Sequence, residues 1–278
     1  MERRLVPGVF VVIVLGVFSS SVFALPPMGP PCAGLNQGQW SVGFDYGYSE
    51  MDVEVSGPAF PSNQKDAEIE DFESNMYFGT IAYGVSNEWE IFTRLGMADV
   101  EFDADPAPAN GSDFDGGSEF AFAVGTKRTL ADNGNVKWGC LFQFLWSEAD
   151  DKTTASTSYG NGAILGDGDP VPSGTKVDVD WYEIQLAMGP TIQVADGVCV
   201  YGGPFLHFME GDLAAKYTIS EVGSFQEEYD LEQLSEFGGY VGGIVELGDA
   251  LADATLHGEV QFTSDAFAFA IGANIPIP

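Results

Sequence analysis

Large apolar side chains alternate with smaller or polar ones along residues 137–150, KWGCLFQFLWSEAD. The apolar positions are Trp138, Cys140, Phe142, Phe144 and Trp146. A period of two is that of a β-strand with two different faces. A soluble sandwich turns such an aromatic face toward a core, whereas a membrane barrel turns it toward lipid and the polar face toward the lumen. The rest of the chain has to decide between these two arrangements.

The same alternation recurs along the whole chain. It predicts ten strands, at residues 39–49, 72–84, 88–102, 118–129, 136–148, 177–194, 198–217, 229–247, 254–263 and 266–276. Short Gly, Asn and Asp turns follow the second, fourth, sixth and eighth strands, as tight hairpins require. Longer acidic segments, at 50–70, 103–117, 149–175 and 218–228, join four of the other pairs, and a short connection at Ser264-Asp265 joins the last. This wiring predicts an all-β, antiparallel up-and-down transmembrane β-barrel of about ten strands, with eight as the alternative.

Tryptophan positions agree with a membrane-spanning strand. Trp138 and Trp146 stand eight residues apart. At ~3.3 Å per residue and a tilt of ~40°, they are separated by roughly 20 Å along the membrane normal, close to the ~25 Å apolar band of such barrels. We therefore expect Trp40, Trp138 and Trp146 to form an aromatic belt in contact with outer-membrane lipid.

The N-terminus has the layout of a secretory signal. Arg3 and Arg4 precede an apolar run over 9–18, and small residues end at Ala24. An uncleaved membrane anchor is the alternative, but the run is shorter than the ~20 residues that a span needs. We expect three parts: a signal peptide at 1–24, a Pro-rich periplasmic segment at 25–38 and an outer-membrane barrel at 39–278.

Charge and cysteine content exclude several classes of protein. The chain has 42 acidic and 10 basic residues and a net charge of −32, so nucleic acid is not an expected partner. Its 21 Phe, 10 Tyr and 5 Trp argue against disorder. Three cysteines form no complete disulfide framework. Gly29-Pro30-Pro31 before Cys32 is a poor match to a lipidation signal.

In these features the chain resembles the bacterial outer-membrane β-barrel superfamily, the small porin-like and OmpA-like proteins. The resemblance covers the signal peptide and residues 39–276, and it is a likeness of pattern. It implies location in the bacterial outer membrane. One departure is the last strand, which ends at Asn274-Ile275-Pro276-Ile277-Pro278 instead of on a terminal aromatic residue.

Polar positions opposite the apolar face should line the barrel interior. Among these, the charged residues expected to form a lumen network are Glu90, Arg94, Glu119, Lys127, Lys137, Glu183, Glu236 and Glu259. Gln143, Gln185, His207, His257 and Gln261 are expected beside them. Buried charges need partners, so the favoured hypothesis is an occluded lumen in which Arg94 pairs with Glu119 or Glu183. The alternative is a narrow porin-like constriction for small cations or polar solutes.

Other function classes find little support. His207 with Glu210 and Asp212 is the best candidate for a protease or lipid hydrolase, but the sequence has no Ser-centred nucleophile motif. We therefore predict no enzyme activity, catalytic residue or cofactor. The acidic clusters at 113–116 and 167–169 lack the twelfth-position Glu of a Ca²⁺-binding loop, and no metal site is predicted. A soluble secreted barrel with an apolar ligand is a further alternative.

The long connections carry much of the negative charge. We expect them to form acidic loops on the outer face, where they would gather cations within about a Debye length of ~8 Å. Their acidic residues are Asp52, Glu54, Asp66, Glu68, Asp103, Asp105, Asp113, Asp115, Asp150, Asp151, Asp167 and Asp169.

Overall fold

The computed structural model describes residues 25–56, 66–103, 113–152, 176–219, 223–248 and 251–277, and nearly all of them after residue 39 are in strands. The strands are β1 (Trp40–Ser56), β2 (Asp66–Ser86), β3 (Trp89–Asp103), β4 (Asp113–Asp115), β5 (Glu119–Asp132), β6 (Val136–Lys152), β7 (Lys176–Ala195), β8 (Val198–Ile219), β9 (Gly223–Gln233), β10 (Phe237–Glu246), β11 (Thr255–Phe262) and β12 (Ala266–Ile277). None of the described residues forms a helix long and apolar enough to cross a membrane.

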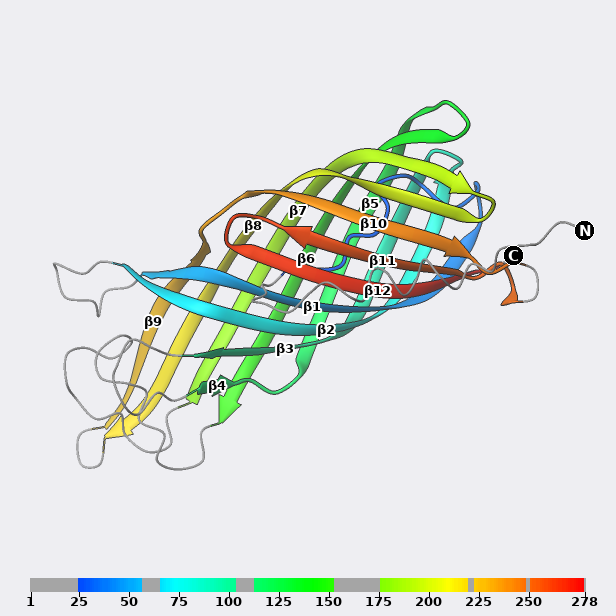
Figure 1. Ribbon diagram of the computed structural model, residues 1–278. Coiled ribbons are helices and arrows are strands. Elements are labelled where there is room, and N and C mark those ends of the chain that lie inside the picture. Colours follow the sequence, from blue (N-terminus) through cyan, green and yellow to red (C-terminus); the bar gives the residue numbers. More distant parts are fainter. Residues whose placement is uncertain are drawn as a thin grey trace, which may run out of the picture.

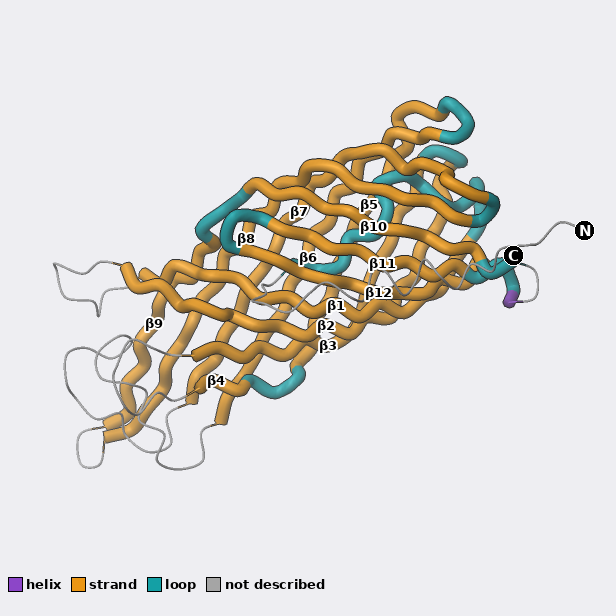
Figure 2. The backbone as a smooth tube through the Cα atoms, in the orientation of Figure 1, coloured by secondary structure: helices purple, strands orange, loops and turns teal. Residues whose placement is uncertain are grey.

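The strands form one closed antiparallel barrel (Figures 1 and 2). Most strands pair with their neighbours in sequence, except that β4 does not pair with β5 and β9 does not pair with β10. The barrel closes where β12 pairs with β1, from Trp40 opposite Ile277 to Met51 opposite Ala266. Strand β8 pairs with both β9 and β10, which follow each other in the chain and lie at different distances along β8. These pairings confirm the predicted ten-stranded barrel. The short turns between β2 and β3, β5 and β6, and β7 and β8 lie at one rim, together with the C-terminal end of β12 (Figure 1). We call this the short-turn rim.

The barrel has ten strands near the short-turn rim and two fewer farther away. The β11–β12 hairpin ends at Thr263–Asp265, whereas β1 and β9 continue past it and pair with each other from Val53 to Ser56. The predicted strand at 229–247 is therefore two strands, β9 and β10, separated at 234–236. Before this break β9 pairs with β1, and after it β10 pairs with β11. The short strand β4, which pairs with β3, lies within a predicted loop.

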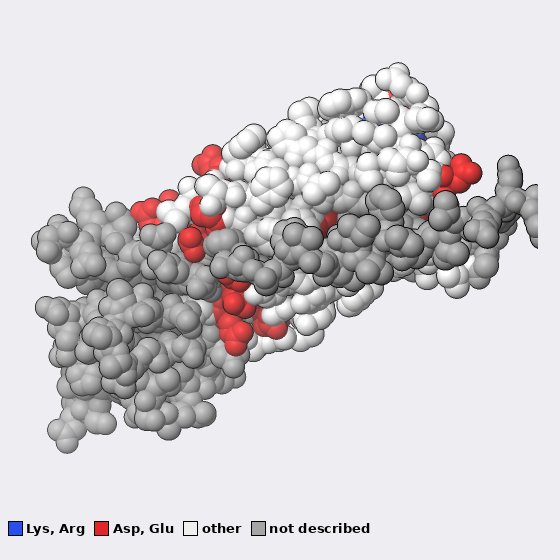
Figure 3. All heavy atoms as spheres, viewed as in Figure 1, with Lys and Arg blue, Asp and Glu red and all other residues white. Residues whose placement is uncertain are grey.

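Near the short-turn rim, the two faces of each strand are arranged as in a membrane barrel. On β6, Trp138 is 47% exposed and Phe142 is also exposed, while Gly139 and Gln143 are buried. The same alternation runs from Trp40 to Tyr48 on β1, with apolar side chains outward and small or polar ones inward. These outward side chains form an apolar belt. Figure 3 shows this belt as a broad white band between acidic groups.

Farther from the short-turn rim, the two faces exchange character. On β1, Glu50, Asp52 and Glu54 continue the outward series, while Met51, Val53 and Val55 continue the inward one. On β3, outward Leu95 and Met97 give way to Asp99 and Glu101, while Ala98, Val100 and Phe102 are buried inside. We call this section, which has the polarity of a water-soluble protein, the outer barrel.

An apolar core fills the outer barrel from wall to wall. Phe72 of β2 stacks on Phe102 of β3 at a centroid distance of 5.6 Å. Phe72 also meets Trp181 of β7 edge-on at 6.2 Å, although β2 and β7 are not neighbouring strands. Further members of this core are Met51, Val53, Val55, Val100, Leu145, Ala149, Val179, Leu213, Tyr229 and Leu231.

The strands of the outer barrel extend beyond the predicted strand boundaries, into residues that the sequence assigned to loops. Most of the acidic residues expected in loops lie in strands instead: Asp52, Glu54, Asp66, Glu68, Asp103, Asp113, Asp115, Asp150 and Asp151. At Asp52, Glu54 and Asp150 the alternation continues with its faces exchanged, so these acidic positions resembled loop sequence. Asp105, Asp167 and Asp169 lie outside the described residues.

Replacing Phe72 by Ala tests whether this core holds the outer barrel together. Phe72 is fully buried, so we expect Phe72→Ala to lower the free energy of unfolding by about 3–5 kcal/mol. Thermal unfolding in detergent, followed by near-UV circular dichroism, measures this change. The control is Phe142→Ala, which removes an exposed ring of the apolar belt. Equal stability of Phe72→Ala and the unmodified protein would contradict a packed core.

Candidate functional site: a plugged lumen and an acidic outer face

A ring of polar side chains crosses the ten-stranded part of the lumen. Arg94 Nη1 donates to Gln143 Oε1 at 2.8 Å, and Gln143 Nε2 donates to Gln185 Oε1 at 2.5 Å. Gln185 Nε2 then reaches Gln261 Oε1 at 3.1 Å, from β7 to β11. All four side chains are buried. Because β7 and β11 are not neighbours, this last bond spans the lumen.

Asp45 closes the ring on its other side. Arg94 Nε lies 3.3 Å from Asp45 Oδ2, and His257 Nε2 lies 3.0 Å from Asp45 Oδ1. Thr80 also donates its hydroxyl to this carboxylate. Asp45 is 1% exposed and Arg94 is 4% exposed, so this is a buried ion pair whose charges depend on each other.

The N-terminal segment runs through this part of the lumen. Residues 25–33 are buried apart from the partly buried Pro30, and the segment passes inside the sheet to reach β1 at the rim (Figure 2). We call residues 25–37 the plug segment. The sequence predicts a Pro-rich periplasmic segment at 25–38, and in the structure residues 25–33 of it are enclosed by the barrel. A ten-stranded barrel encloses more space than its inward side chains fill, and the segment occupies the remainder.

The wall holds the plug segment by its main chain. Glu259 accepts hydrogen bonds from the amides of Met28 and Gly29, at 2.6 and 2.8 Å. Glu90 accepts from the amides of Gly34 and Leu35, at 2.9 and 3.2 Å. The remaining bonds are Gln261 to the Pro26 carbonyl, Arg94 and Gln143 to that of Pro27, Arg94 to that of Met28, and the Ala33 amide to Thr129.

Three glycines of the wall leave room for the plug segment. A Cβ on Gly47 would lie 2.8 Å from Pro27 Cγ, and one on Gly84 would lie 2.1 Å from the Asn36 carbonyl oxygen. A Cβ on Gly139 would meet the Pro31 oxygen at 2.6 Å and Cys32 Sγ at 2.8 Å. These close approaches come from three strands, β1, β2 and β6. The inner wall is therefore shaped to the segment.

The structure places the predicted lumen residues in two groups. Glu90, Arg94, Lys127, Glu183 and Glu259 are buried inside the barrel. Glu119 is half-buried, and Glu236 is exposed at the break between β9 and β10. Lys137 is 46% exposed at the short-turn rim, where its Nζ lies 3.6 Å from Asp132.

Arg94 pairs with Asp45 instead of the expected Glu119 or Glu183. Asp45 is on the inward face of β1, as its small neighbours are. Inside the closed lumen its carboxylate lies 3.3 Å from the Arg94 guanidinium. Period-two alternation marks Asp45 as inward, so the signal for this partner was present in the sequence.

His207 and Glu183 form a separate buried pair. His207 Nε2 lies 2.8 Å from Glu183 Oε2, and Trp181 Nε1 donates to Glu183 Oε1 at 2.9 Å. Both members of the pair are 1% exposed, and Met209 and Trp181 beside them belong to the apolar core. Glu210 and Asp212, the carboxylates grouped with His207 in the sequence, point outward instead.

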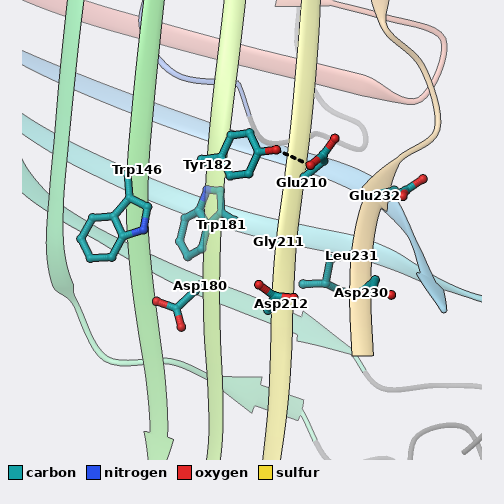
Figure 4. A pocket seen from close by; sticks show the side chains of 10 residues that line it. All are labelled: Trp146, Asp180, Trp181, Tyr182, Glu210, Gly211, Asp212, Asp230, Leu231 and Glu232. Atoms are coloured by element: carbon teal, nitrogen blue, oxygen red, sulfur yellow. Dashed lines mark hydrogen bonds between the residues drawn. The ribbon is translucent and has the colours of Figure 1, made fainter. Parts of the chain in front are cut away.

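The outer barrel carries an acidic face on β6 to β9. Glu148, Asp180, Asp212 and Asp230 stand opposite one another in successive pairs across these four strands. Next to this row, Tyr182 donates its hydroxyl to Glu210, which stands opposite Glu232 (Figure 4). A groove of about 220 Å³ is lined by Trp146, Tyr182 and the carboxylates of Asp180, Glu210, Asp212, Asp230 and Glu232. Trp146 thus marks the outer edge of the apolar belt, while Trp40 and Trp138 lie at its short-turn edge.

Charge repulsion acts on Asp180 at the middle of this face. Partial burial raises the pKa of the Asp180 carboxyl, and the neighbouring carboxylates of Asp178, Asp212 and Asp150 raise it further. Lys216 opposes this shift and forms an ion pair with Asp178 at 2.5 Å. Within the described residues, no group of three His, Cys, Asp or Glu side chains could hold a metal ion.

Comparison with known proteins supports the fold. No protein-family model matches the chain, and no curated protein matches it. Among solved structures, the outer membrane protease OmpT of Escherichia coli is similar, with 10% identity and a TM-score of 0.53, over 91% of this chain and 99% of that one. The outer membrane protein OprG of Pseudomonas aeruginosa also matches, with 10% identity and a TM-score of 0.45, over 88% and 98%. The predicted fold of the bacterial outer-membrane β-barrels is confirmed.

Replacing Arg94 by Met tests the lumen ion pair. The substitution leaves the Asp45 charge buried without its guanidinium, so we expect unfolding in detergent to become easier by about 3–5 kcal/mol. Lys137→Met is the matched control, because its pair with Asp132 is exposed and should contribute less than about 1 kcal/mol. Similar losses for the two variants would show that Arg94 contributes no more than a surface charge.

Replacing Asp180 by Asn tests the repulsion on the acidic face. A carboxyl whose pKa is raised by folding destabilises the folded state above its unfolded pKa, near 3.8, and has no effect once it is protonated in both states. We therefore expect Asp180→Asn to stabilise the protein at pH 7 by about 0.2–1 kcal/mol, the usual range for opposed like charges. The gain should vanish below pH 3.8. A gain that persists in acid would point to a cause other than charge.

Proposed function

We propose that the protein is an integral barrel of the bacterial outer membrane with a structural role, that its lumen is sealed, and that its acidic face lies outside the cell. Two successive seals of different chemistry carry this proposal. The plug segment and the polar ring fill the ten-stranded part, and an apolar core fills the outer barrel. Water would have to cross both to make a pore.

The apolar belt is the surface that would contact membrane lipid. The belt ends in acidic rows on β1, β3 and β6 at similar distances from the short-turn rim. Barrels of this class turn short connections toward the periplasm and long ones outward. The outer barrel would then stand in water beyond the membrane, where its carboxylates gather small cations within about a Debye length of ~8 Å.

The alternative functions need features that the described residues do not support as well. A narrow porin for polar solutes needs a polar path, whereas the outer barrel interior is apolar. A protease or hydrolase needs a histidine that can reach substrate, whereas His207 is enclosed with Glu183. An apolar ligand inside a soluble barrel would compete with the ordered core that includes Phe72 and Trp181.

Planar-bilayer recording of the refolded protein tests the sealed lumen. We expect no discrete conductance steps, because neither the plug segment nor the apolar core leaves a water path. Gly47→Val, which displaces Pro27, should also remain closed because the outer barrel core is intact. Slower gel migration after boiling would verify that each sample is folded. Reproducible ion-conducting steps from the unmodified protein would instead support the narrow porin.

A further inference from the structure

We infer that the ten-stranded part of the lumen is a peptide-binding chamber for an extended, proline-rich main chain, and that residues 26–35 are its built-in, exchangeable ligand. This inference goes beyond a structural barrel, because it assigns a binding site and the chemical class of its occupant.

Main-chain recognition defines what the chamber binds. Nine wall hydrogen bonds end on main-chain atoms of residues 26–35. The amides used are those of Met28, Gly29, Ala33, Gly34 and Leu35. Prolines have no amide proton, and the four in the segment, at 26, 27, 30 and 31, stand where the wall accepts none. The chamber thus recognises a pattern of amides, carbonyls and prolines.

Shape adds a second element of specificity. Gly29 has φ +76°, a conformation that favours glycine, and its missing Cβ would lie 3.2 Å from Lys127 Nζ. On the wall, Gly47 and Gly139 receive Pro27 and the Pro31–Cys32 peptide. A ligand of this chamber therefore needs a glycine after the residue whose amide first reaches Glu259.

Polarity of the wall makes the occupant separable. Glu90, Arg94, Gln143, Glu259 and Gln261 can all bind water once the segment leaves, so an emptied chamber is compatible with solvent. Phe72 and Trp181 of the outer barrel belong to an apolar core that also includes Leu25 and Met28 of the plug segment. Release of the segment would therefore expose these two apolar side chains as well as polar wall groups. The ten-stranded part differs from the outer barrel because its wall has enough polar groups to hold water in place of the segment.

The entrance lies at the short-turn rim. Gln37 donates its amide to Asn87 at 2.9 Å, and Gly38 donates its own to the Gly84 carbonyl at 2.8 Å. These contacts anchor the segment where it leaves the lumen, while the apolar core closes the opposite end. A competing peptide would enter from this rim.

Cys32 provides a native reporter of exchange in the full-length chain. Its thiol is buried against Gly139, whereas Cys140 and Cys199 are partly exposed. In a Cys140→Ser, Cys199→Ser background, a maleimide should label folded protein only when the segment is outside the chamber. We expect Glu259→Gln, which loses a charge that binds two amides, to speed labelling about tenfold. Glu232→Gln on the outer barrel is the matched control and should leave the rate unchanged.

Competition by a synthetic peptide then tests binding directly. The probe is a peptide of residues 25–37 with Cys32→Ser, added to folded protein of the same background. We expect it to raise the Cys32 labelling rate to a plateau with increasing concentration, and the same peptide with Gly29→Val to have no effect. No response to the native peptide, or equal responses to both, would overturn the inference. Bilayer conductance is a separate readout, so failure here leaves the sealed outer barrel to its own test.

Discussion

A strand that passes from lipid into water has to exchange the face that is apolar, and this constraint organises the whole barrel. Within the apolar belt, outward side chains are apolar and the lumen receives polar groups. Beyond Glu50 on β1 the strand continues unbroken, but Val53 and Val55 now point inward. The strands stay antiparallel and hydrogen-bonded in both parts, although the β1–β2 register shifts between Met51 and Val53 and β1 changes its other partner from β12 to β9. The acidic face is the outward side of the outer barrel, which the proposed orientation puts in water.

The part of the barrel with fewer strands is filled by side chains alone, whereas the part with ten strands also encloses the plug segment. Barrel width grows with the number of strands, and about eight strands leave an interior that side chains alone can fill. Past the β11–β12 hairpin the wall loses two strands, and rings such as Phe72 and Trp181 meet across it. In the ten-stranded part, Gly47 and Gly139 widen the space further, and a separate segment of main chain fills it. The opposed carboxylates on β6 to β9 are tolerated because the same strands bury residues such as Val179 and Trp181 on their other face.

Sequence alone predicted the architecture but not the occupant of the lumen. Period-two alternation is a local pattern, so the sequence predicted the correct face of the strand for Trp138, Phe142 and Gln143. The same pattern predicted the ten strands and their alternating short and long connections. The exchange of faces was also present, in Met51-Asp52-Val53-Glu54, but negative charge there suggested a loop. Nothing local in residues 25–38 shows that they turn back into the barrel, because their partners lie more than two hundred residues away, at Glu259 and Gln261. The pairing of Arg94 with Asp45 likewise depends on the shape of the closed lumen.

Burial of the lumen charges depends on the plug segment. A guanidinium inside a barrel loses the water that solvates it, and Arg94 recovers part of this through Asp45, Gln143 and the carbonyl of Pro27. The buried Glu259 carboxylate also loses solvating water, and it accepts hydrogen bonds from two plug amides and the hydroxyl of Tyr201 instead. Without the segment these polar groups could bind water in its place, whereas the apolar wall residues that pack on Leu25 and Met28 would lose their contacts. The apolar core beyond it has no second state of this kind, because an emptied apolar lumen would expose Phe72, Trp181 and Leu231 to water. One barrel therefore joins a permanent seal to a replaceable one, and the boundary between them lies where β1 changes its inward residues from serine and aspartate to methionine and valine.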